Sequence, residues 1–307
     1  MSLIKFLNSP EVKEKFAKTF LFKSPRLKAQ IRARQLTSNH LLVETAFDYL
    51  LRFHLERLNP DSIKRTWVAE IAVQSAIENK STLDLLQQFF DSKISRDKSQ
   101  PTIFEKIYNG FNETKINYER FIYDGVKSDK LIHSCLFLSK LDTIVKSGWH
   151  QFHPQILEID NEGDITDLRN LISLVDFSLF KSKDKLILNP TFGKASSLVN
   201  GAYADLILDD KLIDITTTNK LTISRSQINQ IISYYLLIKI GGIDLARDHK
   251  INKIGLYFSR YAKLYDIPVS FIDENPKLPE FMAWFEIKAK KMFEKTKIPK
   301  RLLILKN

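Results

Sequence analysis

Apolar residues recur at helical spacing through the first half of the chain. In segment 40–58 one stripe consists of Leu42, Ala46, Tyr49, Leu50 and Phe53. Asn59-Pro60 then ends the helix that this stripe predicts. The same spacing predicts two short basic helices within residues 1–36 and further helices at 63–78, 83–92, 102–122 and 129–146. We therefore expect residues 1–150 to form a mainly helical region.

The pattern changes between Gly148 and Pro154, where short β-branched and leucine-rich runs begin. These runs predict strands at 155–159, 185–192, 203–208, 211–217 and 251–259, with a hairpin partner at 264–267. Helical periods remain at 166–177, at 279–295, and from Ser224 or Ser226 to Ile240. The second half, residues 151–307, is thus expected to be an α/β (α+β) domain whose mixed sheet is covered by helices.

One predicted hairpin places two aspartates face to face. Asp209-Asp210 separates the runs 203–208 and 211–217, and a two-residue loop there pairs residue 208 with 211. Asp205 and Asp214 would then lie directly opposite each other, with their side chains about 5 Å apart. Like charges at such a position destabilise a hairpin, so the register calls for a compensating charge. A divalent cation such as Mg²⁺ or Mn²⁺ would supply it.

Composition narrows the classes of function. The chain contains no apolar run of about 18 residues, so we expect no membrane span. Cys135 is the single cysteine, which excludes an internal disulfide framework and a cysteine-based zinc site. It lies in an apolar run and is expected in the core. No glycine-rich phosphate loop is present, which argues against ATP-driven or nicotinamide chemistry. A cytoplasmic location is the default expectation.

The positive charge is concentrated at the two ends of the chain. The formal net charge is +11, while residues 1–36 and 288–307 each carry +7. The centre, residues 37–287, is therefore mildly acidic. Basic ends around an acidic centre suit a polyanion held over a metal site, and they predict a nucleic-acid partner. A lysine-rich surface without such a partner is the alternative interpretation, and charge alone does not separate DNA from RNA.

The order of these elements and their polar residues resembles the PD-(D/E)XK nuclease superfamily, whose core is α-β-β-β-α-β. The RecB-like branch is the most similar. Its pattern is an Asp on the second strand, Asp/Glu-x-Lys on the third and Gln-x-x-x-Tyr on the following helix. This sequence has Asp205, Asp214 and the pair Gln230/Tyr234 at those places. The resemblance covers roughly residues 165–270 and implies a restriction-endonuclease-like core in a nuclease-like domain at 151–307.

The resemblance also implies a metal-dependent nuclease that acts on DNA, with Asp205 and Asp214 on the cation. An upstream helix of the RecB-like branch usually delivers a third ligand. Glu44 and Asp48 stand where the branch has glycine and histidine, so Asp48, with Glu44 one turn earlier, is the candidate. Region 1–150 would thus provide substrate contacts and part of the metal site. A solvated polar face is the alternative for this pair. Weaker candidates are Glu70, Asp167 and Asp176, and His150/His153 are interpreted as a turn.

One residue departs from the pattern. Thr216 stands two residues after Asp214, where the family has a lysine. Losing one preorganised donor of this kind costs roughly 10²–10³ in rate. Lys220 has the same strand parity and is the preferred replacement, ahead of Lys194 and Lys211. Alternatively, the chain is a catalytically inactive nuclease-fold module that binds nucleic acid or a partner protein, or a structural helper in a larger complex.

Overall fold

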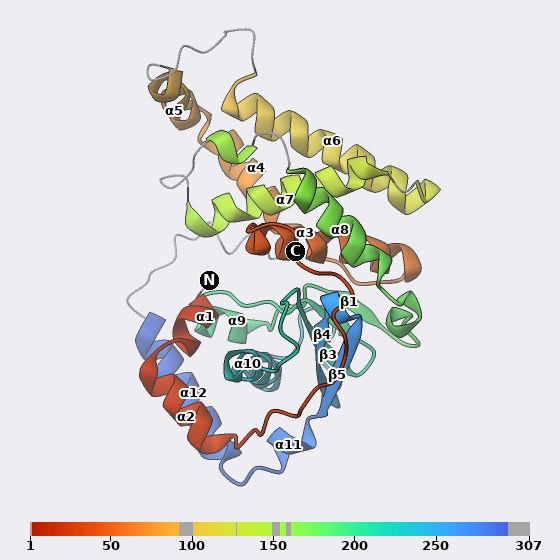
Figure 1. The fold of residues 1–307 in the computed structure, drawn as a ribbon. Coiled ribbons are helices and arrows are strands. Elements are labelled where there is room, and N and C mark those ends of the chain that lie inside the picture. The colour runs from red at the N-terminus through yellow and green to blue at the C-terminus, as the bar shows by residue number, and fades with distance from the viewer. Residues whose placement is uncertain (1, 92–100, 127, 149–153, 158–160, 294–307) are drawn as a thin grey trace. The chain divides into compact units, whose positions relative to one another are not determined.

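The computed structural model describes residues 2–91, 101–126, 128–148, 154–157 and 161–293. The chain divides into two compact units (Figure 1). The first unit comprises residues 1–32, 61–65 and 178–307, and the second comprises 33–60 and 66–177. No single boundary near residue 150 separates them, because residues 1–32 and 61–65 pack with the sheet and the segment up to residue 177 packs with the helices.

A five-stranded mixed sheet forms the centre of the first unit. Its strands lie in the order β1-β2-β3-β4-β5. The strands are β1 (Leu186–Leu188), β2 (Leu206–Leu208), β3 (Lys211–Thr216), β4 (Lys253–Phe258) and β5 (Lys263–Pro268). The pair β3–β4 is parallel and the other neighbours are antiparallel. The expected mixed α/β architecture is therefore present.

The β2–β3 hairpin has the predicted register. Leu208 pairs with Lys211 and Leu206 with Ile213. A two-residue loop connects them, and Asp209 adopts the left-handed backbone conformation with φ 52°. Aspartate tolerates this conformation better than most residues because its short side chain can hydrogen-bond locally. The two turn residues, Asp209 and Asp210, thus determine which residues face each other across β2 and β3.

Asp209 also organises the segment that leads into β1. Its carboxylate accepts hydrogen bonds from the backbone N–H groups of Lys183 (3.0 Å), Asp184 (2.9 Å) and Lys185 (3.2 Å), and from the Ser182 hydroxyl (3.0 Å). Burial by itself would raise the pKa of this carboxyl. The hydrogen bonds outweigh burial, so the pKa of Asp209 lies below its usual value.

The first sheet edge is shorter than predicted and has an unexpected neighbour. β1 ends at Leu188 because Asn189 has φ 51° and Pro190 follows. On its outer side, Ile63 forms a parallel bridge with Ile187. The predicted helix at 63–78 therefore begins only at Val68, since the backbone of Ile63 is engaged with Leu186 and Leu188.

Helix α10 (Arg225–Gly241) packs directly on the sheet, and a layer of α1 (Ser2–Leu7), α2 (Pro10–Thr19) and α12 (Leu278–Phe293) covers its other side (Figure 1). Aromatic rings fill this outer layer. The ring centroids of Phe16 and Phe281 are 4.9 Å apart, and those of Phe6 and Phe285 are 5.1 Å apart. Both pairs are packed edge to face. Such pairs stabilise beyond the area that they bury. The N-terminal segment is thus part of the sheet domain's core.

Short elements complete this unit. They are α9 (Lys194–Leu198) between β1 and β2, the 3₁₀ turn η4 (Ser259–Tyr261) between β4 and β5, and α11 (Ser270–Asp273). A further 3₁₀ turn, η3 (Phe177–Phe180), lies at the sequence boundary between the units. The ring of Phe180 packs 5.0 Å from that of Tyr257 on β4.

The second unit is helical, as the first half of the sequence predicts. It contains α3 (His40–Leu58), α4 (Val68–Glu78), α5 (Lys80–Asp91), α6 (Ile103–Asp124), α7 (Asp129–Ser147) and α8 (Glu162–Ser173). The predicted strand at 155–159 is wrong where it can be examined, because Pro154–Leu157 forms the 3₁₀ turn η2. Residues 158–160 lie outside the described part. Among the described helices, none is long and apolar enough to cross a bilayer.

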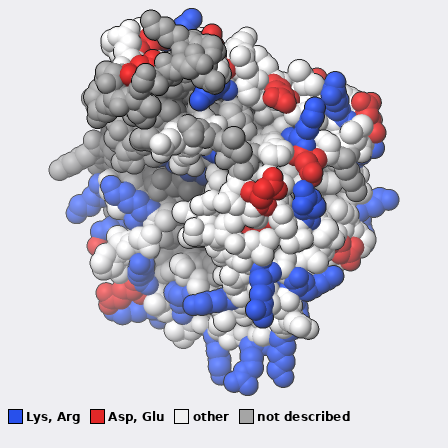
Figure 2. Space-filling model, turned by 45° about the horizontal axis from the view of Figure 1, so that its top comes forward, with Lys and Arg blue, Asp and Glu red and all other residues white. Residues whose placement is uncertain are grey.

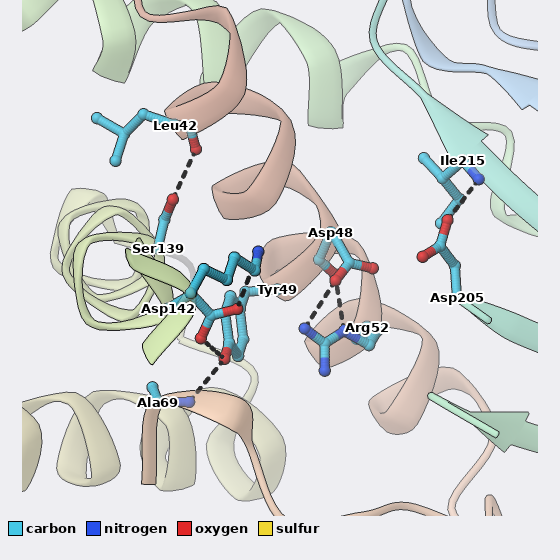
Figure 3. A network of polar contacts seen from close by, with 10 residues as sticks. Leu42, Asp48, Tyr49, Arg52, Ala69, Ser139, Asp142, Asp205 and Ile215 are labelled. Carbon is cyan, nitrogen blue, oxygen red and sulfur yellow. Dashed lines mark hydrogen bonds and ion pairs between the residues drawn. The ribbon is translucent and has the colours of Figure 1, made fainter. Parts of the chain in front are cut away.

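Polar side chains connect α3 and α7 inside this unit. The Tyr49 hydroxyl donates to Asp142 Oδ1 at 2.7 Å and accepts from the Ala69 N–H at 3.3 Å (Figure 3). Arg52 lies over the Tyr49 ring at 4.3 Å. Burial raises the pKa of Asp142 to about 6, although the Lys146 charge and the Tyr49 hydrogen bond act in the opposite direction. The bundle is therefore held by a buried polar network as well as by apolar packing.

Asp209→Asn keeps the tolerance for a positive φ but removes the charge that attracts four donors. We expect a loss of about 1–2 kcal/mol of unfolding free energy at pH 7, because hydrogen bonds to a charged acceptor are the stronger ones. The folded-state pKa lies below the unfolded value, so this stability is present at neutral pH and disappears as pH falls through the folded-state pKa. Urea unfolding at pH 7 and pH 3 measures it.

The neighbouring variant Asp210→Asn is the matched control for this loop. The Asp210 carboxylate accepts an exposed hydrogen bond from the Asn252 side-chain amide at 3.0 Å. We expect a change within about 0.5 kcal/mol at both pH values. An equal loss in the two variants at pH 7 would contradict the role assigned to Asp209.

Candidate functional site

The two aspartates of the hairpin lie where the register predicts. Asp205 directly precedes β2, and the pairing of Leu206 with Ile213 places it opposite Asp214 on β3. Asp205 Oδ2 accepts a hydrogen bond from the backbone N–H of Ile215 at 2.6 Å (Figure 3). Asp214 is buried, with 7% of its surface exposed, and Asp205 is half-buried. The hydrogen bond to β3 therefore holds Asp205 next to its counterpart.

Helix α10 brings an amide to this pair. Ser224 begins the helix with a capping box, in which the side chain of Gln227 returns to the Ser224 backbone. Gln227 is therefore used for capping and does not take part in the site. One turn later, Gln230 Nε2 lies 3.5 Å from Asp214 Oδ1 and 3.0 Å from the Tyr234 hydroxyl oxygen. Gln230 thus connects the carboxylate with the tyrosine.

The pKa of Tyr234 responds both to its burial and to the two nearby carboxylates. Its pKa is raised well above the usual value, first by burial and then by the charges of Asp214 and Asp205. The hydrogen bond from Gln230 opposes this shift, and Tyr203 adds to it. Tyr234 is itself buried, with only 8% of its surface exposed. Its ring packs against Phe192, with the centroids 5.6 Å apart.

Thr216, the residue at which the resemblance would place a lysine, is a buried hydroxyl residue. Thr216 ends β3 and is 8% exposed. Because the strand stops there, the alternation that favoured Lys220 does not extend to it, and Lys220 is exposed. Lys211 is at the opposite end of β3, in an ion pair with Asp266 at 2.9 Å. Lys194 is exposed at the start of α9.

Three consecutive side chains on η4 hold the chain where it leaves β3. The Ser259 hydroxyl donates to the Thr216 carbonyl at 3.1 Å, Arg260 Nε donates to the Thr217 carbonyl at 2.5 Å, and the Tyr261 hydroxyl donates to the Asn219 carbonyl. Arg260 is only 1% exposed, which is rare for arginine.

The sequence interpretation missed this turn. Its signal is the run Ser-Arg-Tyr directly after an apolar strand that pairs in parallel with β3. A charged residue at that position is brought close to the end of the neighbouring strand. The Ser259–Tyr261 turn therefore fixes the backbone on which Thr216 stands.

The other acidic candidates belong to the second unit. Asp48 forms an ion pair with Arg52 at 2.8 Å, and Glu70 pairs with Lys115 at 3.2 Å. Glu44 is half-buried on α3, and Asp167 is fully buried on α8. Asp176 follows α8 in the same unit. The roles of Glu44 and Asp48 as metal ligands stay predictions.

Two further sequence candidates complete the survey. His150 and His153 lie outside the described residues. Cys135 is fully buried on α7, as expected for a core residue, and burial raises the pKa of its thiol. Within the ranges that the structure describes, no three His, Cys, Asp or Glu side chains are grouped as they would be around a metal ion.

Comparisons with protein-family models, with curated proteins and with solved structures found no match to this chain. A function must therefore be inferred from the chain's own residues. The feature with the most chemical content is the group formed by Asp205, Asp214, Gln230 and Tyr234 on adjacent elements of one unit.

Arg260→Met tests the hold on the end of β3. Methionine fills much of the same volume but leaves the Thr217 carbonyl without its charged donor. We expect the free energy of unfolding to fall by about 2–3 kcal/mol, since a buried acceptor loses a charge-assisted hydrogen bond. Urea denaturation measures the change. The exposed Arg26 provides the control Arg26→Met, for which we expect less than about 0.5 kcal/mol. Equal effects in both variants would contradict a structural role for Arg260.

Proposed function

We propose that this protein is a metal-dependent nuclease that hydrolyses phosphodiester bonds of DNA, with Mg²⁺ or Mn²⁺ as its cofactor. The observation that carries this proposal is the pairing of Asp205 with Asp214, joined through Gln230 to Tyr234. Two carboxylates supported by an amide and placed beside one sheet are suited to a hard cation.

The order of elements supports the proposal. The succession β1, β2, β3, α10, β4 follows the β-β-β-α-β part of the superfamily's core, and α9 is an addition between β1 and β2. The parallel β3–β4 pair with α10 as its crossover agrees with that pattern. The helix that precedes β1 in sequence, α8, belongs to the second unit and is a departure. On this basis we propose a restriction-endonuclease-like core.

The residues present fit a divalent cation. Carboxylate oxygens are the ligands that Mg²⁺ prefers, and the cation usually keeps several waters. Burial is the main cause that raises the pKa of Tyr234, and the negative charges of Asp214 and Asp205, which such a cation would offset, raise it further. When bound, the ion supplies Lewis acidity at a phosphate oxygen and lowers the pKa of its water.

Each side chain then has a role of its own. Asp205 and Asp214 hold the cation, and the hydrogen bond from Ile215 keeps Asp205 in position. Gln230 orients a water or a phosphate oxygen through its amide. The hydrogen bond from this amide to the Tyr234 hydroxyl keeps it in position. Thr216 offers a neutral hydroxyl where the family has an ammonium group, and Lys220 is our candidate for the missing positive charge.

Surface charge supports a polyanionic substrate. Lys and Arg side chains project over much of the face shown in Figure 2, with acidic side chains between them. Contacts with phosphates depend on such charges and release counterions, so binding should weaken as salt rises. The net charge of +11 agrees with this substrate class.

A binding module without catalysis is the second candidate function. Thr216 favours it, because a threonine hydroxyl cannot replace the charge of a lysine at the transition state. In this case the same fold would bind nucleic acid or a partner protein without cutting it.

DNA cleavage separates the two functions. With single- and double-stranded DNA and Mg²⁺ or Mn²⁺, we expect cleavage that Asp214→Ala reduces by at least about 100-fold, since the cation loses a ligand. Asp210→Asn, which changes the half-buried second residue of the hairpin's turn, should cleave like the wild type. If the wild type cleaves DNA no faster than Asp214→Ala, the enzymatic function is wrong and the binding module is the remaining candidate.

Thr216→Lys tests the catalytic position itself. If Thr216 occupies the place of the lysine, the added ammonium group should raise the cleavage rate, by up to roughly 10²–10³ on the scale of one preorganised donor. The rate is followed on the same substrates under single-turnover conditions. Thr218→Lys, one of the neighbouring threonines, should leave it unchanged. An equal gain in both variants would indicate nonspecific charge.

A further inference from the structure

Asn189 lies in the same row of the sheet as the aspartate pair. The register of Leu188 with Leu206 places Asn189 opposite Asp205, and the Asn189 N–H donates to the Asp205 carbonyl at 2.9 Å. Asp205 in turn is opposite Asp214. Directly opposed residues in antiparallel strands have Cα atoms about 4.5–5.5 Å apart. The row therefore runs from Asn189, directly after β1, to Asp205, directly before β2, and on to Asp214 on β3.

The backbone of Asn189 is unusual for a residue at a strand end. Its φ of 51° is in the left-handed region, which costs most L-residues roughly 1–2 kcal/mol and which asparagine tolerates best after glycine. Strained conformations of this kind persist where the surrounding structure requires them, and they are frequent at functional sites.

The side-chain oxygen of Asn189 lacks an internal partner. Asn189 Oδ1 is buried, and among the described residues nothing hydrogen-bonds to it. A buried acceptor without a partner costs about 1–3 kcal/mol, so such atoms generally have an ordered water or an ion to satisfy them. An amide oxygen is neutral and hard, as are the carbonyl oxygens that bind Mg²⁺ and Ca²⁺ in proteins.

We propose that Asn189 provides a neutral oxygen ligand to the divalent cation held by Asp205 and Asp214. This inference rests on the proposed metal site and adds a residue that the sequence pattern does not indicate. It explains in one step the orphaned oxygen, the left-handed backbone and the position next to Asp205. Two charged carboxylates and one neutral amide oxygen, from neighbouring positions of this row, would then be the protein ligands of the ion.

Mn²⁺ binding, measured by titration calorimetry without DNA, tests the ligand separately from activity. Asn189→Gly removes the amide while suiting the positive φ, so the fold should be kept. We expect about 10-fold weaker Mn²⁺ binding. Asn189→Asp keeps the oxygen and adds a charge, and it should bind Mn²⁺ more tightly than the wild type. Melting curves confirm that both variants fold.

Asn200→Gly is the matched control, because Asn200 also has a positive φ, 57°, but does not lie in this row. Its Mn²⁺ affinity should equal that of the wild type. Wild-type affinity in Asn189→Gly, or weaker binding in Asn189→Asp, would overturn the proposal and leave Asn189 a structural strand end. Should Asp214→Ala also bind Mn²⁺ as well as the wild type, the metal site itself is wrong. If Asp214→Ala loses Mn²⁺ affinity and Asn189→Gly does not, the metal site stands and only the ligand role of Asn189 is wrong.

Discussion

The hairpin of β2 and β3 imposes the constraint on which the sheet unit depends. Its two-residue turn sets Asp205 opposite Asp214, and the backbone N–H of Ile215 holds Asp205 there. Two like charges at this spacing oppose folding unless something offsets them. Gln230 contributes an amide dipole at 3.5 Å, and a cation would contribute far more. The arrangement that is costly for stability is thus also the one at which we propose a metal ion.

Hydrogen bonds and packing from several segments of the unit hold this hairpin in place. The Asp209 carboxylate ties the turn to the segment before β1, and the Ser259–Tyr261 turn holds the chain after β3. Helix α10 packs between the sheet and the aromatic layer of α1, α2 and α12. A site on rigid elements keeps its side chains in place better than a site on loops.

The residue at position 216 bears on which of the two proposed functions applies. Thr216 is buried and its carbonyl is held by Ser259, so the polypeptide around it is ordered. A cation bound by Asp205 and Asp214 would still polarise a phosphate without the lysine, although with less stabilisation of the developing charge. Slow cleavage and binding without cleavage would therefore differ in one interaction, while the proposed metal site and the fold would be common to both.

Local patterns determined much of this protein. Turn chemistry and the two-residue period of strands were enough to predict the register of Asp205 with Asp214. A serine cap at Ser224 or Ser226 predicted the start of α10, and the structure has the cap at Ser224. Contacts between distant segments were beyond such patterns. The bridge from Ile63 to β1, the grip of Arg260 on Thr217 and the burial of Tyr234 each depend on which surfaces meet after folding. Sequence thus determined which residues face each other within the hairpin, because adjacent residues set that geometry. Only the tertiary structure decided which neighbours hold it, because packing between remote segments has no local signature.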